Sequence, residues 1–166
     1  GETPYDALVI ATGSAPFIIP VAGKELPGVC TYRDLEDTNA MIAVSKPGAK
    51  AVVVGGGLLG LEAAAGMAAR GAEVTVIHLM PTLMERQLDE AASWLLKEAL
   101  EGRGQTILTG ADTAEIYGQG KVEGVRLKEP QEIRTEILHQ LGRTHPGEVY
   151  AVHGKNPQLP APLHLP

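Results

Sequence analysis

Hydrophobic and polar positions divide the middle of the chain into a strand, a helix and a second strand. The run Ala51–Val54 is continuously apolar and β-branched, which is typical of a strand covered on both faces in a parallel sheet. Leu58–Arg70 is rich in Ala and Leu and contains no proline, so it predicts a helix that Gly71 ends. Glu73–Ile77 is again β-branched. This order predicts a βαβ unit with a right-handed crossover.

Further elements are expected on both sides of this unit. Residues 7–10 read as a short buried strand, and residues 34–48 as a helix that Pro47 and Gly48 terminate. A second amphipathic helix is expected within residues 87–104, with Asp89 as its N-cap. Its predicted apolar face consists of Leu88, Ala92, Leu95, Leu96, Ala99 and Leu100.

The pattern changes towards the C-terminus. Residues 105–110 predict a third strand, and residues 114–127 alternate and turn at Gly118–Gly120, as a β-hairpin does. Residues 130–141 are compatible with a helix, whose inward side chains would be Ile133, Ile137, Leu138 and Leu141. The proline-rich residues 156–166 are expected to be extended or disordered. The fold class predicted is α/β, a Rossmann-like βαβ nucleotide-binding domain with a parallel sheet plus a β-hairpin.

The residues between the first strand and the helix match the pattern G-x-G-x-x-G. They are Gly55, Gly56, Gly57, Leu58, Leu59 and Gly60. Between a strand and a helix, this pattern indicates a dinucleotide-binding loop. Gly55 would permit the tight turn, Gly57 the approach of a pyrophosphate to the backbone, and Gly60 close packing of helix on sheet. The diphosphate would lie at the positive end of the helix. The alternative is a glycine-rich turn that only allows close packing.

Three charged or titratable side chains near this loop are further candidates. His78 follows the second strand, where dinucleotide folds commonly place an acid that accepts hydrogen bonds from the ribose. A neutral imidazole can bond one hydroxyl, and Arg86 is a candidate partner for a 2′-phosphate, so selectivity for NAD by a strand-end acid is not encoded. His78 could equally be a partly exposed residue without a ligand contact. Glu62 either interacts with the helix dipole or faces the nicotinamide half of a cofactor.

Composition excludes several function classes. The chain has 166 residues, an apolar fraction of 44% and a net charge of −6, which argues against nucleic acid and anionic membranes as partners. Cys30 is the only cysteine, so one chain cannot form a disulfide framework or a CxxC redox pair, and we expect a small buried hydrophobe. The apolar stretch 7–23 is too interrupted to span a bilayer, and the absence of a secretory signal predicts a cytoplasmic protein. No metal site is expected from the spacing of His139, His145, His153 and His164.

Two segments together carry a resemblance to a known family. "YDALVIATGS" (Tyr5–Ser14), paired with "VVVGGGLLGLEAA" (Val52–Ala64), resembles the two-dinucleotide-binding flavoproteins, which are pyridine nucleotide-dependent oxidoreductases. With "HLMPTLMERQLDE" (His78–Glu90), the chain is most similar to the large subunit of NAD(P)H-dependent nitrite reductases over about residues 3–128. The resemblance implies that Ala11, Thr12 and Gly13 lie near FAD. It also implies that the glycine loop and Glu62 bind the nicotinamide dinucleotide.

By this resemblance, hydride passes from NAD(P)H to flavin, and an iron–sulfur/siroheme centre then reduces nitrite to ammonia. The first flavin glycine motif, the second flavin segment and the cysteine ligands of such a centre are not recognisable in the sequence. We therefore expect a remnant of the FAD-binding domain with its connection at 1–48, an NAD(P)-binding domain at 49–128 and an atypical tail at 129–166. No catalytic residue is assigned.

Such a fragment is expected to bind NAD(P)H, to lack FAD and to be inactive alone. Its expected partners are the missing flavin and iron–sulfur/siroheme domains or a second copy of the chain. Two alternatives stay open, which are an electron-transfer flavoprotein of the ferredoxin- or rubredoxin-reductase type and a non-catalytic nucleotide-binding or interaction module left by truncation.

Overall fold

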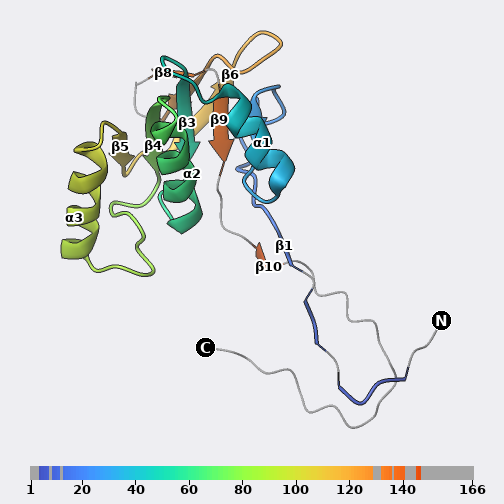
Figure 1. The fold of residues 1–166 in the computed structure, drawn as a ribbon. Coiled ribbons are helices and arrows are strands. Elements are labelled where there is room, and N and C mark those ends of the chain that lie inside the picture. The colour runs from blue at the N-terminus through green and yellow to red at the C-terminus, as the bar shows by residue number, and fades with distance from the viewer. Residues whose placement is uncertain are drawn as a thin grey trace.

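The computed structural model places a central sheet between helices on one face and a second, smaller sheet on the other (Figure 1). It describes residues 4–7, 9–11, 13–128, 132–135, 137–140 and 145–146. The central sheet has five strands, and every neighbouring pair in it is parallel. In spatial order these strands are β2 (Val29–Cys30), β9 (Ile137–Gln140), β3 (Lys50–Val54), β4 (Glu73–His78) and β5 (Thr106–Thr109).

The predicted βαβ unit is confirmed. Strands β3 and β4 are adjacent and parallel, with Val52 opposite Thr75 and Val53 opposite Val76, and helix α2 (Leu58–Ala69) connects them. The predicted third strand is β5, which pairs with β4. The α/β class with a parallel sheet predicted from the sequence is therefore correct.

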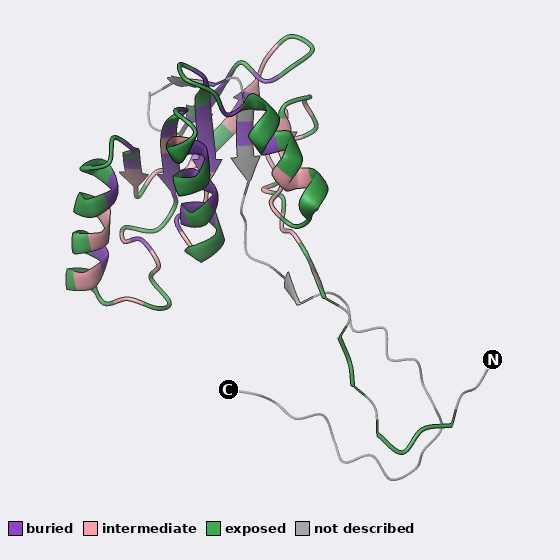
Figure 2. Ribbon diagram, in the orientation of Figure 1, coloured by how far each residue is buried: buried purple, intermediate pink, exposed green. Residues whose placement is uncertain are grey.

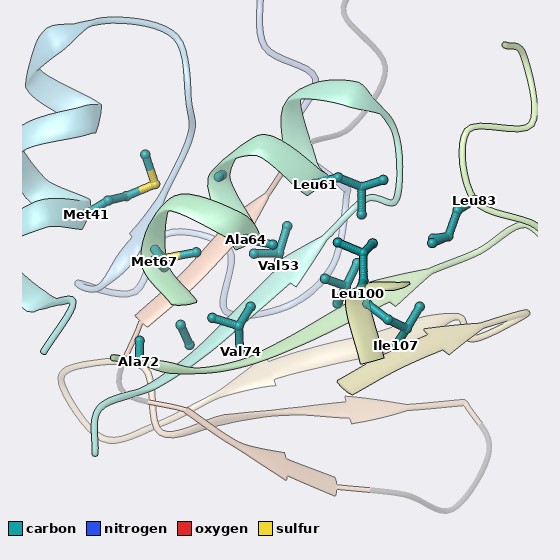
Figure 3. Close-up of a cluster of buried hydrophobic side chains, with 13 residues drawn as sticks. Met41, Val53, Leu61, Ala64, Met67, Ala72, Val74, Leu83, Leu100 and Ile107 are labelled. Carbon is teal, nitrogen blue, oxygen red and sulfur yellow. The ribbon is translucent and has the colours of Figure 1, made fainter. Parts of the chain in front are cut away.

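The central sheet is buried on both faces, which explains its continuous apolar strands. Val53 and Val76 belong to the core on the helix side, which also holds residues of α2. Figure 3 shows Ala64 and Met67 of α2 over Val53 and Val74 of the sheet. The neighbouring residues Val52 and Ile77 belong to a second core on the opposite face. Successive strand residues point to opposite faces, so both must be apolar in a strand that is covered twice.

The second core lies against a three-stranded antiparallel sheet. Its strands are β6 (Thr113–Tyr117), β7 (Gly124–Leu127) and β8 (Glu132–Arg134). Strands β6 and β7 are the predicted hairpin, and Ile116 and Val125 point into the second core from them. A short antiparallel pair, β1 (Ser14–Ala15) with β10 (His145–Pro146), lies apart from both sheets (Figure 1).

Two of the helices begin directly after an aspartate N-cap. In α1 (Leu35–Val44) the Asp34 side chain accepts the N–H of Asp37, and in α3 (Glu90–Glu101) the Asp89 side chain accepts the N–H of Ala92. Helix α2 ends before Gly71, whose φ of 93° lies in the left-handed region. No helix among the described residues is long and apolar enough to cross a membrane.

The apolar face predicted for α3 is only partly correct. Ser93 and Leu100 are buried and Leu96 packs against the core, whereas Leu95 is 61% exposed. Trp94 of the same helix is 60% exposed. Helix α3 packs along a narrow stripe, because it contacts one edge of the sheet rather than lying across it as α2 does (Figure 2).

The buried strand expected at residues 7–10 is wrong. Among these residues, Val9 is 86% and Ile10 is 59% exposed, and the described ones form no strand. A strand buried on both sides needs paired neighbours. The described part of the chain supplies none here, and the segment before β1 leads away from the sheets (Figure 1).

The helix considered for residues 130–141 is also wrong. The described residues of that segment form β8 and β9, and β9 enters the central sheet between β2 and β3. Leu138 pairs with Val29 on one side and Val52 on the other and is fully buried. Hydrogen bonding to two neighbouring strands outweighs a helical spacing of apolar residues. Part of the expected tail therefore completes the parallel sheet, while the boundaries of the three-part division remain a prediction.

Candidate functional site

The glycine loop turns sharply out of β3 and leads into α2. The N–H of Gly55 donates to the carbonyl of Ile77 at 2.8 Å, and the φ of Gly55 is 127°. That conformation is rarely open to a residue with a Cβ, so the turn requires glycine. This agrees with the task that the sequence pattern gave to Gly55.

The N-terminus of α2 is bare. Gly57 is the N-cap residue and no side chain caps the helix. A Cβ added to Gly57 would meet nothing within 4 Å, so the space in front of its backbone is open. The first N–H groups of a helix have no partner within the helix and carry its positive dipole end. The geometry therefore suits an anionic group placed against the backbone of Gly57.

The other residues of the motif lie around this opening. Gly60 is buried on the side of α2 that faces the sheet, which is where close packing was expected. Leu58 is 60% exposed and Leu59 is 37% exposed at the start of the helix. The start of α2 is therefore exposed at Leu58 and Leu59 and closely packed at Gly60.

Both the N–H and the carbonyl group of Gly56 form hydrogen bonds. Its N–H donates to Nδ1 of His78 at 3.0 Å, and its carbonyl accepts the N–H of Met84 at 3.0 Å. A Cβ at Gly56 would lie 2.6 Å from Cδ2 of Leu83 and 2.8 Å from Cγ of His78. Gly56 therefore holds the loop against the segment that follows β4, a task that the sequence motif did not reveal.

His78 is buried at the end of β4, with 8% of its surface exposed. The partial exposure that one alternative gave to His78 is therefore wrong, whereas the presence or absence of a ligand contact stays a prediction. Nε2 of His78 lies 3.2 Å from Oε2 of Glu85. Because Nδ1 accepts a backbone N–H, the ring proton resides on Nε2, which donates to the Glu85 carboxylate. Both ring nitrogens are thus occupied by protein groups.

Glu62 and Arg86 are both exposed. The helix dipole acts most strongly in the first turn of a helix. Helix α2 begins at Leu58, so Glu62 lies after that turn. Arg86 directly follows Glu85 in the segment attached to the glycine loop. Glu85 itself was not among the candidates from the sequence. The sequence signal for Glu85 was its place as the first acid after a strand that ends in His78 instead of an acid.

Of the residues expected near FAD, the two that the structure describes are not enclosed by other parts of the protein. Ala11 and Gly13 are exposed, and Thr12 lies outside the described residues. The segment that carries them leads away from the glycine loop, and Figure 2 shows its described part as exposed. The described residues of this segment therefore do not fit FAD by themselves.

Cys30 behaves as a packed apolar residue. It lies at the edge of the helix-side core, and burial together with the negative charge of Asp37 raises its pKa from 9.0 to about 11. Its thiol is therefore protonated at neutral pH and is a poor nucleophile. Within the described ranges, no group of three or more His, Cys, Asp or Glu residues is placed to hold a metal ion.

Comparisons with known proteins converge on one family. Residues 1–144 match the sequence model described as pyridine nucleotide-disulphide oxidoreductase. The chain is 51% identical over 135 residues to the nitrite reductase [NAD(P)H] of Bacillus subtilis, which covers 81% of this chain and 17% of that protein. It is 37% identical over 137 residues to the nitrite reductase [NAD(P)H] large subunit of Klebsiella oxytoca, covering 82% of this chain and 14% of that protein.

A solved structure with the same fold is the ferredoxin reductase for the CYP199A2 system from Rhodopseudomonas palustris. The TM-score is 0.73 at 29% sequence identity, over 78% of this chain and 32% of that one. The chain therefore spans less than a fifth of the two nitrite reductases and about a third of the ferredoxin reductase.

Proposed function

Because the chain belongs to the pyridine nucleotide-disulphide oxidoreductase family, we propose that it is the NAD(P)H-binding part of an FAD-dependent oxidoreductase. One observation carries the proposal, which is the uncapped N-terminus of α2 with open space in front of Gly57. This opening lies at the carboxyl ends of β3 and β4, where open parallel sheets bind their ligands. A dinucleotide diphosphate matches the site in charge and in its need for close backbone approach.

The described residues fit the dinucleotide as follows. The first turn of α2 and Gly57 hold the diphosphate, while Gly55 and Gly60 shape the turn and seat the helix. Leu58, Leu59 and Glu62 line the exposed side of the helix towards the cofactor. When bound, NAD(P)H supplies a hydride for FAD. The chain binds and orients the donor, and no residue of it is assigned a chemical step.

FAD belongs to the longer enzyme in this proposal. Ala11, Thr12 and Gly13 supply one edge of its site, and the rest comes from flavin-binding segments that the sequence does not display. The proposed partners are therefore flavin and iron–sulfur/siroheme domains, or a second copy of the chain. A net charge of −6 supports neither a nucleic-acid nor a membrane partner, and we propose a cytoplasmic location.

Nitrite is the proposed final electron acceptor. Support comes from the 51% identity to a protein named nitrite reductase [NAD(P)H]. An electron-transfer flavoprotein of the ferredoxin- or rubredoxin-reductase type is the second candidate, favoured by the shared fold with a ferredoxin reductase. A non-catalytic nucleotide-binding or interaction module is the third, favoured by the exposed segment around Ala11 and Gly13. The second candidate differs from the first in its electron acceptor. The third differs from both in that it contains no flavin and transfers no electrons.

A calorimetric titration of the chain with NADH tests the proposal. Gly57→Leu places a side chain in the open space before α2 and should weaken binding at least about tenfold, ~1.4 kcal/mol. Gly66→Leu is the matched control, because Gly66 lies exposed in the same helix and its added Cβ also meets nothing within 4 Å. Equal NADH affinity in the two variants would show that the nucleotide binds elsewhere.

A further inference from the structure

Position 78 follows the glycine loop at the spacing where dinucleotide folds carry a ribose-binding acid, but a histidine occupies it. The imidazole is turned into the protein. Nδ1 is taken by the N–H of Gly56 at 3.0 Å, and Nε2 by Glu85 at 3.2 Å. No ring nitrogen is left for a ribose hydroxyl. The first carboxylate reached from the end of β4 is therefore that of Glu85.

Backbone contacts fix Glu85 beside the loop. The preceding residue, Met84, donates its N–H to the carbonyl of Gly56, and Leu83 is fully buried under the same glycine. Met84 has a φ of 49°, a left-handed conformation that a residue with a Cβ adopts only when its surroundings enforce it. The carbonyl of Met84 accepts the N–H groups of Gln87 and Leu88 and so closes this turn.

The Glu85 carboxylate is hydrogen-bonded to the protein but remains partly exposed to solvent. His78 is its hydrogen-bond partner among the described residues and engages Oε2, while the side chain remains 30% exposed. A carboxylate can accept several hydrogen bonds, so Glu85 retains acceptor capacity on its exposed side. Arg86, the next residue, is exposed and carries the nearest positive charge along the chain.

We propose that Glu85, positioned by His78, is the acid that accepts hydrogen bonds from the adenosine ribose of the nicotinamide dinucleotide. It thereby selects NADH over NADPH. This inference rests on the proposed function and names the group that sets its cofactor preference. Ribose hydroxyls are donors to a carboxylate. A 2′-phosphate in their place would bring a second negative group against Glu85, and like charges at short range repel.

The test compares NADH and NADPH affinities of the whole chain by calorimetry. We expect the wild type to bind NADH at least about tenfold more tightly. Glu85→Gln keeps the size of the side chain and removes the charge, and should reduce this ratio to about threefold or less. Glu98→Gln, an exposed acid on α3, is the matched control and should leave the ratio unchanged. Added salt should lower the wild-type ratio, because it screens the repulsion.

The outcomes separate this inference from the proposed function. An unchanged ratio in Glu85→Gln, or a wild type that prefers NADPH, overturns the role of Glu85 while nucleotide binding stands. A wild type that binds neither nucleotide overturns both. If Glu85→Gln does not fold, the role of Glu85 is tested by the ratio of NADH to NADPH affinity in Glu85→Asp and by the salt dependence of this ratio in the wild type. A wild-type ratio that does not respond to salt counts against the carboxylate.

Discussion

The backbone N–H of Gly56 donates to Nδ1 of His78 across 3.0 Å, and this bond connects the glycine loop to the end of β4. It explains why the strand ends in a histidine. The imidazole accepts from the loop with one nitrogen and donates to Glu85 with the other. A carboxylate in its place has only acceptors and could not also donate to Glu85.

Gly56→Ala should destabilise the chain. The added methyl group would lie 2.6 Å from Leu83 and 2.8 Å from the His78 ring, both of which are buried. Overpacking of this kind costs about 1–3 kcal/mol, to be measured by urea unfolding. Gly66→Ala, at an open site in α2, should instead raise stability by up to about 1 kcal/mol. Wild-type stability in Gly56→Ala would contradict the packing described.

His78→Leu should leave the N–H of Gly56 without its acceptor, and a buried unsatisfied donor costs about 1–3 kcal/mol. His78→Asn offers a side-chain oxygen near the position of Nδ1 and should recover most of that loss, although it cannot reach Glu85. Amide hydrogen exchange at Gly56 reports the bond directly. We expect fast exchange in His78→Leu and slow exchange in His78→Asn. Equal protection in both variants would mean that the imidazole does not hold the loop.

The Cys30 thiol should resist alkylation until strongly alkaline pH. Burial and Asp37 raise its pKa from 9.0 to about 11, so the reactive thiolate is scarce at pH 8. Because the folded chain holds this proton more tightly than the unfolded chain, the associated stability is present below pH 9 and is lost as the pH rises towards 11. Iodoacetamide labelling followed by mass spectrometry measures the effect. Rapid labelling of the folded chain at pH 8 would show an accessible thiolate.

Arg86→Gln should weaken NADPH binding by about fivefold, ~1 kcal/mol, and leave NADH binding nearly unchanged. Arg86 is exposed beside Glu85 and is the candidate cation for a 2′-phosphate. Arg103→Gln removes the same charge from an exposed site beyond the end of α3 and serves as the control. If NADH and NADPH binding fall equally, Arg86 contacts a part of the nucleotide that both share.

The chain by itself should bind NAD(P)H weakly, retain no FAD and catalyse no NAD(P)H oxidation with nitrite or artificial acceptors. The described residues around Ala11 and Gly13 form no flavin cradle, and hydride transfer requires the two rings to be held together. Visible absorbance, a diaphorase assay and size-exclusion chromatography with light scattering test this. A yellow, active monomer would show that residues other than those around Ala11 and Gly13 build a flavin site.

Much of the fold could be predicted from the sequence because its signals are local. The run Ala51–Val54, the glycine loop and the helix that Gly71 ends each depend on neighbouring residues, and they specified β3, α2 and β4. Asp89 marked the start of α3 for the same reason, since a cap acts within one turn. The G-x-G-x-x-G spacing likewise located the candidate site.

What only the tertiary structure decided depends on contacts between distant residues. Leu138 lies in a strand because Val29 and Val52 flank it, and Val9 is exposed because no described strand covers it. The direction of the His78 side chain follows from Gly56 and Glu85, neither of which its own strand pattern could specify. The packing of the whole chain determines which strands pair and which group a buried side chain contacts. Hydrogen bonds across the sheet and the loop join residues that are far apart in the sequence, and the local pattern of apolar and polar positions carries no information about such pairs.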